Sequence, residues 1–163
     1  MFSEQNVIET SHLKLVNAML DGMIKTDLKI ISAETGSVMH ALKISEPGFK
    51  EFGEVYFSMV DSGAIKGWKR HKEMVLNLVV SAGAVRFVLY DDRPNSASCN
   101  HFQEIILSKD KNYSRLTVPP MVWMGFQGMG ADTNMLLNIV DMEHSSEEID
   151  RLTLNGINFN WER

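Results

Sequence analysis

The chain has 163 residues, of which 44% are hydrophobic and 23% are charged, and its formal net charge is −5. This composition excludes a disordered or fibrous chain, and the length suits one domain with a substantial core. The acidic balance and the lack of a basic stripe argue against nucleic acid as a partner.

From about residue 28 onward the chain consists of short runs of β-branched, aliphatic and aromatic residues separated by Gly, Asp, Asn or Pro. The spacing of these runs is typical of a jelly-roll barrel. We predict an all-β, single-domain fold over residues 28–163, preceded by an N-terminal arm or strand at 1–27. The predicted strands are 28–32, 37–43, 53–60, 65–69, 73–80, 84–91, 102–107, 114–118, 122–125 and 134–140. Residues 145–151 resemble a capping box that opens a short helix or turn.

Two features of the sequence bear on where the protein works. No stretch approaches the roughly 18 apolar residues of a membrane-spanning helix, and residues 1–6 lack the basic and apolar regions of a secretion signal. Cys99 is the only cysteine, so the chain has no internal disulfide and no Cys-rich zinc site. We therefore expect a cytoplasmic protein with no membrane partner.

Five motifs follow one another in an order that carries more information than any of them alone. They are Phe-Gly-Glu-Val-Tyr-Phe-Ser at 52–58, Gly-Ala-Ile-Lys-Gly-Trp-Lys-Arg-His-Lys at 63–72, Val-Leu-Tyr-Asp-Asp-Arg at 88–93, Val-Pro-Pro-Met-Val-Trp-Met-Gly-Phe at 118–126 and Phe-Asn-Trp at 159–161. In this order they resemble the dTDP-4-dehydrorhamnose 3,5-epimerase family, a branch of the cupins. The resemblance implies a cofactor-independent enzyme with a nucleotide-sugar substrate. It also implies a homodimer whose protomers exchange an N-terminal strand and help to build each other's site.

The sequence departs from this family at the catalytic positions. Where the family has its catalytic histidine this chain has Lys69, and the second family histidine corresponds to Met124. The tyrosine that serves as general acid in the family is replaced by Asn138, and the carboxylate that orients the family's histidine is replaced by Asn155. The sugar 3,4-ketoisomerases, also cupins, carry a His-x-His-Lys motif that the chain matches at His71 but not at Lys69.

Epimerisation beside a ketone requires a base, a group that stabilises the enolate and an acid on the opposite face of the sugar. Alternate residues of a strand share a face, so Lys69, His71 and Glu73 form the predicted catalytic cluster. Burial and the proximity of two cations would lower their pKa values, so either Lys69 or His71 could act as base. Glu73 is placed to orient His71. A one-residue bulge at Gly67 would reverse these facings.

The remaining candidates are substrate-binding residues. Tyr56 could stack on a base or donate a proton, and Glu54 and Ser58 share its face. The full set of predicted substrate-binding residues is Lys66, Tyr56, Glu54, Ser58, Asn138 and Trp68.

Metal chemistry in cupins draws on two or three histidines and a carboxylate, and only one histidine lies at the expected strand. We therefore predict no metal site and no cofactor.

The sequence favours a nucleotide-sugar epimerase or isomerase that abstracts a proton next to the ketone of an NDP-4-keto-6-deoxy sugar, in bacterial surface-polysaccharide biosynthesis. Two alternatives stay open. One is a cupin that binds a nucleotide sugar without turnover, because three catalytic positions are replaced. The other is a 3,4-ketoisomerase.

Overall fold

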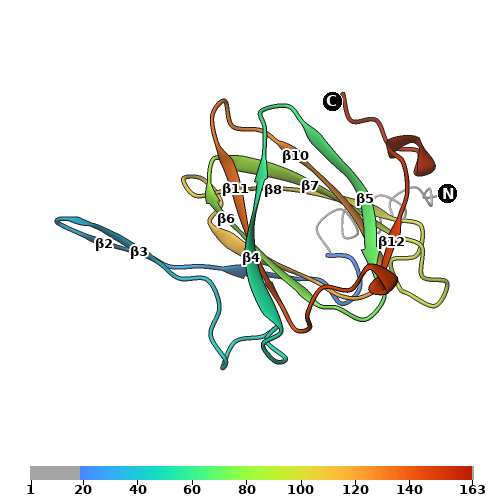
Figure 1. Cartoon of the computed structure of the whole chain (residues 1–163), viewed down its shortest axis with the longest axis horizontal. Coiled ribbons are helices and arrows are strands. Elements are labelled where there is room, and N and C mark those ends of the chain that lie inside the picture. Colours follow the sequence, from blue (N-terminus) through green and yellow to red (C-terminus); the bar gives the residue numbers. More distant parts are fainter. Residues whose placement is uncertain (1–18, 163) are drawn as a thin grey trace, which may run out of the picture.

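The computed structural model describes residues 19–162, and in it two five-stranded antiparallel sheets face each other (Figure 1). The first sheet has the order β1 (Ile24–Asp27), β9 (Ser114–Val118), β6 (Leu76–Ala82), β11 (Asn134–Val140) and β4 (Glu54–Val60). The second has the order β12 (Ile149–Arg151), β5 (Ile65–His71), β10 (Val122–Gly128), β7 (Ala84–Asp91) and β8 (Phe102–Ser108). A hairpin of β2 (Ile30–Ala33) and β3 (Gly36–Met39) projects from this body. The predicted all-β jelly roll is confirmed.

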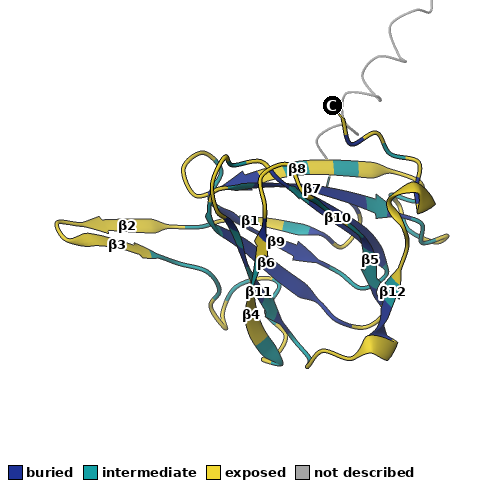
Figure 2. Cartoon of the chain, turned by 45° about the horizontal axis from the view of Figure 1, so that its top comes forward, coloured by how far each residue is buried: buried dark blue, intermediate teal, exposed yellow. Residues whose placement is uncertain are grey.

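The main core lies between the two sheets. Alternate residues of the strands point inward, and Leu78, Phe87, Leu116 and Leu136 are completely inaccessible to solvent. Full burial of one such side chain stabilises the fold by about 1.5–3 kcal/mol. The inner strands are dark in Figure 2, whereas β4 and the β2–β3 hairpin are largely exposed. The first sheet therefore ends in a strand that is only partly covered.

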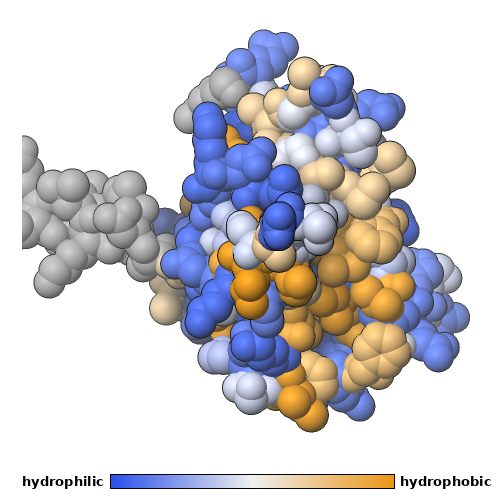
Figure 3. Space-filling view, turned by 90° about the vertical axis from the view of Figure 1, so that its left-hand side faces the viewer, coloured by the Kyte–Doolittle hydropathy of each residue, from blue (hydrophilic) through white to orange (hydrophobic). Residues whose placement is uncertain are grey.

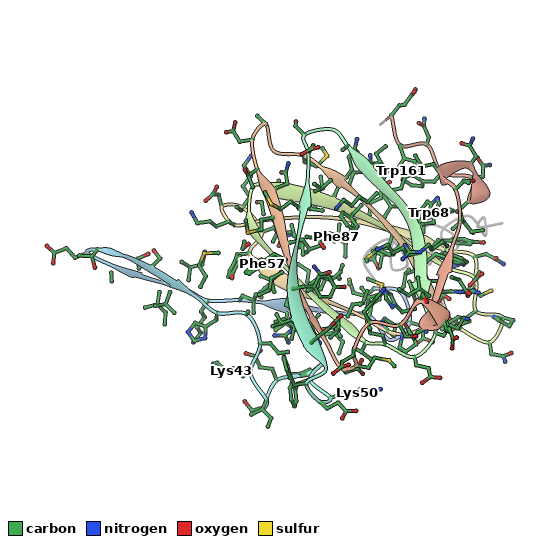
Figure 4. All side chains as sticks on the ribbon, viewed as in Figure 1. Lys43, Lys50, Phe57, Trp68, Phe87 and Trp161 are labelled. Atoms are coloured by element: carbon green, nitrogen blue, oxygen red, sulfur yellow. The ribbon has the colours of Figure 1, made fainter. Side chains whose placement is uncertain are left out.

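A second apolar cluster lies on the outer side of the second sheet. The C-terminal segment returns over β5 and β10 and places Ile157 and Trp161 against Trp68, Val88 and Trp123. Trp68 and Trp161 are neighbours outside β5, while Phe87 lies between the sheets (Figure 4). The strands β10 and β7 of the second sheet are thus covered on both faces, whereas its edge strand β8 is largely exposed.

A buried carboxylate organises the loop after β7. Asp91 is fully buried and accepts hydrogen bonds from the guanidinium and the backbone N–H of Arg93 and from the hydroxyls of Ser96 and Ser98. Burial raises the pKa of Asp91, but these donors outweigh it and hold the pKa well below its usual range. Arg93 also donates to the carbonyl of Asp21, which joins the loop to the chain just before β1.

Most predicted strands are present, and the differences have local causes. The predicted strand at 73–80 begins only at Leu76, because the N–H groups of Glu73 and Met74 donate to the carboxylate of Glu148 and not to a neighbouring strand. Residues 145–151 form a single 3-10 turn, η1 (Ser146–Glu148), followed by β12. The predicted cap is wrong, since the Ser145 side chain makes no capping hydrogen bond.

The predicted N-terminal arm at 1–27 is only partly described. Residues 24–27 form β1, which pairs with β9 of the same chain. Residues 1–18 lie outside the described part, and with them most of the segment for which strand exchange was expected. Among residues 19–162, no helix has the length and apolar character of a membrane span.

Candidate active site

A pocket of about 310 Å³ opens between β4 of the first sheet and β5 of the second. Two predicted substrate-binding residues, Glu54 and Tyr56, line it from β4. Two predicted catalytic residues, Lys69 and His71, line it from β5. The structure therefore brings these four residues together from strands that belong to different sheets. The other lining residues are His144 and Ile149.

A bulge in β5 decides which side chains face this pocket. Lys69 pairs with Met124 of β10 and Lys66 pairs with Phe126, so two residues of β5 lie opposite Gly125. The bulge precedes both Lys69 and His71, and these two side chains stay on one face, about 7 Å apart along the strand. The same bulge brings Lys66, three residues before Lys69, to the inner side. There its Nζ lies 6.0 Å from the centre of the Phe126 ring and donates to the carbonyl of Met59 at 2.6 Å.

A carboxylate holds His71 in one orientation. His71 Nδ1 lies 2.7 Å from Oε2 of Glu148, and both side chains are at least nine-tenths buried. An ionised carboxylate only accepts hydrogen bonds, so Nδ1 carries a proton, and in the neutral form of the ring the lone pair lies on Nε2. Within residues 19–162, Nε2 has no hydrogen-bond partner. The pair thus presents a basic nitrogen from a side chain that lines the pocket.

The backbone around this pair is also fixed. Oε1 of Glu148 accepts the N–H groups of Glu73 and Met74, each at 2.9 Å. Burial raises the pKa of Glu148, but the two N–H donors and His71 outweigh it, so the pKa lies below the usual range. Met121 has a φ of 65° after the Pro119–Pro120 corner, and its N–H donates to the carbonyl of His71 at 2.7 Å.

The charges around the pocket shift two further pKa values. Burial, Arg151 and Lys66 lower the pKa of Lys69, which has no carboxylate partner among the described residues. Burial and the nearby Glu54 carboxylate raise the pKa of Tyr56, so its hydroxyl keeps its proton at neutral pH. The pocket therefore combines a proton donor on β4 with basic groups on β5.

Two predicted binding residues adjoin the pocket on the β4 side. Asn138 of β11 is buried, pairs with Tyr56 across the strands and donates to the hydroxyl of Ser58 at 3.1 Å. Its amide also donates to the carbonyl of Leu136 at 3.2 Å. Asn138 thus packs beside Tyr56 and fixes Ser58.

Comparison with known proteins gives the family. A dTDP sugar isomerase from Desulfovibrio desulfuricans G20 is 35% identical, with 88% of this chain and 94% of that chain covered and a TM-score of 0.85. This chain belongs to the dTDP-sugar isomerase family, together with the dTDP-4-dehydrorhamnose 3,5-epimerases. No family model matches the sequence.

More distant relatives agree with this placement. The dTDP-4-dehydrorhamnose 3,5-epimerase of Bacillus anthracis, solved with TDP and pyrophosphate, has the same fold at 20% identity. Its TM-score is 0.75, with 86% of this chain and 85% of that chain covered. A probable low-salt glycan biosynthesis epimerase of Haloferax volcanii is 24% identical over 128 residues, which are 75% of this chain and 81% of the relative. The relatives of this dTDP-sugar isomerase family member are thus epimerases and isomerases.

Two predicted site residues lie away from the pocket of this family member. Trp68 is 1% exposed, points to the outer side of β5 and donates from Nε1 to the carbonyl of Leu154. It packs against Trp161 and cannot reach a ligand between the sheets. Glu73 lies beyond the end of β5, is exposed and touches the His71–Glu148 pair only through its backbone N–H. The carboxylate that orients His71 is Glu148 and not Glu73.

Sequence reasoning missed the partner of His71. Glu148 is 77 positions away, and nothing local marks its side chain as buried. The sequence resemblance aligns the family's orienting carboxylate with Asn155, but Asn155 lies in the exposed turn η2 (Leu154–Gly156). His144 and Arg151 were also missed, because they reach the site only when the C-terminal segment turns back beside β5. Residues 19–162 contain no group of three or more metal-binding side chains placed to hold a metal ion.

Proposed function

We propose that this protein is a cytoplasmic isomerase that moves a proton next to the ketone of an NDP-4-keto-6-deoxy sugar, in bacterial surface-polysaccharide biosynthesis. The observation that carries the proposal is the His71–Glu148 pair, in which a buried carboxylate orients a histidine that lines a pocket together with Lys69 and Tyr56. The names of the relatives support dTDP as the nucleotide.

The residues of the pocket suit the three roles that this chemistry needs. His71 Nε2 takes the proton from C3 or C5, and the ionised Glu148 stabilises the imidazolium that forms. The positive charges of Lys66 and Arg151, next to Lys69, stabilise the negative charge that develops at the ketone as the proton leaves. Tyr56, on the opposite wall, returns a proton to the other face of the sugar. No cofactor enters these steps.

The proposal also includes a homodimer. The outer face of β4 exposes Val55, Phe57 and Met59, at 50%, 62% and 57%. Their cross-strand neighbours on β11 are also apolar, and β4 is the edge strand of its sheet. Hydrophobic side chains also gather on the end of the molecule from which the β2–β3 hairpin projects (Figure 3). Apolar patches of this kind mark interaction surfaces, and a second copy of the chain is the proposed occupant.

Solvent exchange in variants tests the proposed role of His71. In deuterium oxide, the wild type is expected to exchange hydrogen at C3, at C5 or at both positions of dTDP-4-keto-6-deoxyglucose. His71→Asn removes the base and is expected to abolish exchange, whereas His40→Asn, a histidine outside the pocket, is expected to leave it unchanged. A His71→Asn protein that folds and exchanges at the wild-type rate would contradict the assignment.

Ligand binding separates this function from its non-catalytic alternative. A nucleotide-sugar-binding cupin would be stabilised by the ligand, by about 2.7 kcal/mol at a hundredfold excess over Kd, and yet show no exchange. A 3,4-ketoisomerase would instead move the keto group to a new carbon, which the same spectra would show as a new product.

A further inference from the structure

Lys69 has an unusual setting for a lysine. Its side chain lines the pocket, and no described residue accepts a hydrogen bond or an ion pair from its amine. The two nearest lysines of the chain are different: Lys66 donates to the carbonyl of Met59, and Lys72 donates to the carbonyl of Glu147 and lies 3.6 Å from Asp150. The amine of Lys69 is therefore left available to a ligand in the pocket.

The surroundings of Lys69 lower the pKa of its amine. Its environment is partly desolvated, and the charged groups that shift this pKa, Arg151 on β12 and Lys66 on β5, are both cations, while Glu54 lines the β4 wall of the same pocket. The carboxylate Glu148 is engaged with His71 and two backbone N–H groups, so it is not available to pair with the Lys69 amine. Desolvation and an adjacent cation are the two conditions that turn a lysine into a nucleophile towards carbonyl groups.

We propose that Lys69 forms a covalent Schiff base with the ketone of the sugar substrate, so that the proton is removed from an iminium ion and not from the free ketone. This proposal rests on the function proposed above, because it needs a keto sugar in the pocket. It assigns Lys69 the part of a nucleophile and leaves His71 as the base.

The bond changes balance without any oxidant or reductant. The Lys69 nitrogen lone pair attacks the carbonyl carbon, and one proton passes from that nitrogen to the carbonyl oxygen to give a carbinolamine. The hydroxyl takes up a further proton and leaves as water, while the lone pair that nitrogen has regained forms the carbon–nitrogen double bond of the iminium ion. His71 Nε2 then removes the hydrogen from the neighbouring carbon, and the electron pair of that C–H bond moves toward the iminium nitrogen to give an enamine. Reprotonation at carbon and hydrolysis regenerate the ketone and the amine.

This route gives the pocket a strong electron sink. A free ketone would need hydrogen-bond donors aimed at its oxygen. Of the two cations near Lys69, Arg151 pairs with it across the strands, and Lys66 donates to the carbonyl of Met59. An iminium nitrogen bonded to the reacting sugar carries its positive charge at the carbon skeleton itself. Lys69 and His71 alternate on one strand face, which places the nucleophile and the base on the same wall of the pocket.

Reductive trapping tests the proposal directly. The full chain is incubated with dTDP-4-keto-6-deoxyglucose and sodium cyanoborohydride, which reduces an iminium ion faster than a ketone. The expected result is a protein whose mass increases by that of the substrate less one oxygen atom, with the adduct located on Lys69 by peptide mapping. Lys69→Arg, which keeps a long basic side chain but removes the nucleophilic amine, is expected to lose the adduct, and Lys72→Arg on the same segment is expected to keep it.

The outcomes separate the Schiff base from the isomerase function. Exchange of the substrate hydrogens without any adduct would overturn the Schiff base and leave the isomerase standing. An adduct on Lys69 without exchange would support the Schiff base and remove the isomerase, and absence of both would remove both. An adduct located on Lys66 would overturn the assignment to Lys69. Thermal unfolding of Lys69→Arg shows whether the loss of adduct reflects chemistry or a failure to fold.

Discussion

Glu148→Gln probes how the orientation of His71 supports the base. The glutamine carbonyl can still accept the N–H groups of Glu73 and Met74, so the backbone contacts persist. Its amide NH₂, however, faces His71 Nδ1 as a donor. His71 must then accept at Nδ1 and carry its proton on Nε2, the tautomer that cannot take a proton from substrate.

The size of the effect follows from this exchange of partners. A hydrogen bond to a charged group is worth about 1.5–3 kcal/mol, which corresponds to about 10- to 150-fold in rate. The wrong tautomer adds to this loss, and in the serine protease triad a comparable change lowers kcat by about 10⁴. We expect the rate of solvent hydrogen exchange into the keto sugar to fall by about 10²-fold or more.

The assay is the initial rate of deuterium incorporation, followed by proton NMR in wild type and variant. Glu147→Gln is the matched control, because Glu147 is exposed and bonds to Lys72 only through its backbone carbonyl. The free energy of unfolding in urea shows whether the variant is folded, and we expect it to lie within about 3 kcal/mol of the wild-type value. If a folded Glu148→Gln protein exchanged at the wild-type rate, the contact with Glu148 would not be what makes His71 an effective base.

Three further predictions concern stability and assembly. Asp91→Ala is expected to lower the free energy of unfolding by about 3–5 kcal/mol in urea at pH 7, because it leaves Arg93 without its partner. Because folding lowers the pKa of Asp91, its contribution to stability is complete above about pH 4 and is lost as the pH falls further. The difference in free energy of unfolding between wild type and variant should therefore be smaller at pH 3 than at pH 7. An equal difference at both pH values would contradict this. Gly125→Ala should cost about 1–3 kcal/mol in the same assay, because the new Cβ would lie 2.9 Å from the Trp161 ring; an unaltered midpoint would show that this ring is not held. Phe57→Glu should convert the dimer to a monomer in light scattering while Ile106→Glu on β8 does not, and a wild type that is already monomeric would remove the dimer.

The fold could be predicted because its signals are local. Alternating apolar residues between Gly, Asn and Pro turns mark most strands, and the period of two places Lys69 and His71 on one face. The bulge at Gly67 did not disturb this relation because both residues follow it. It did change the position of Lys66 relative to Lys69: Gly67 is the local signal of such a bulge, but strand alternation alone does not place residues three apart on one face.

The errors at the site arise from contacts between distant segments. Trp68 was expected to bind substrate, but the C-terminal segment covers it with Trp161, 93 positions later in the numbering. Glu73 was assigned to orient His71 because strand alternation was continued past the end of β5. The carboxylate that performs this task comes from Glu148, whose position depends on the turn before β12 and not on its own sequence context.

The most direct test of the isomerase activity is proton NMR of the wild-type protein with dTDP-4-keto-6-deoxyglucose in deuterium oxide. An isomerase of this kind is expected to cause loss of the proton signal at C3, at C5 or at both, at a rate proportional to protein concentration. Retention of both signals, under conditions in which the sugar nucleotide raises the unfolding temperature of the protein, would contradict it and leave a protein that binds this ligand without turning it over.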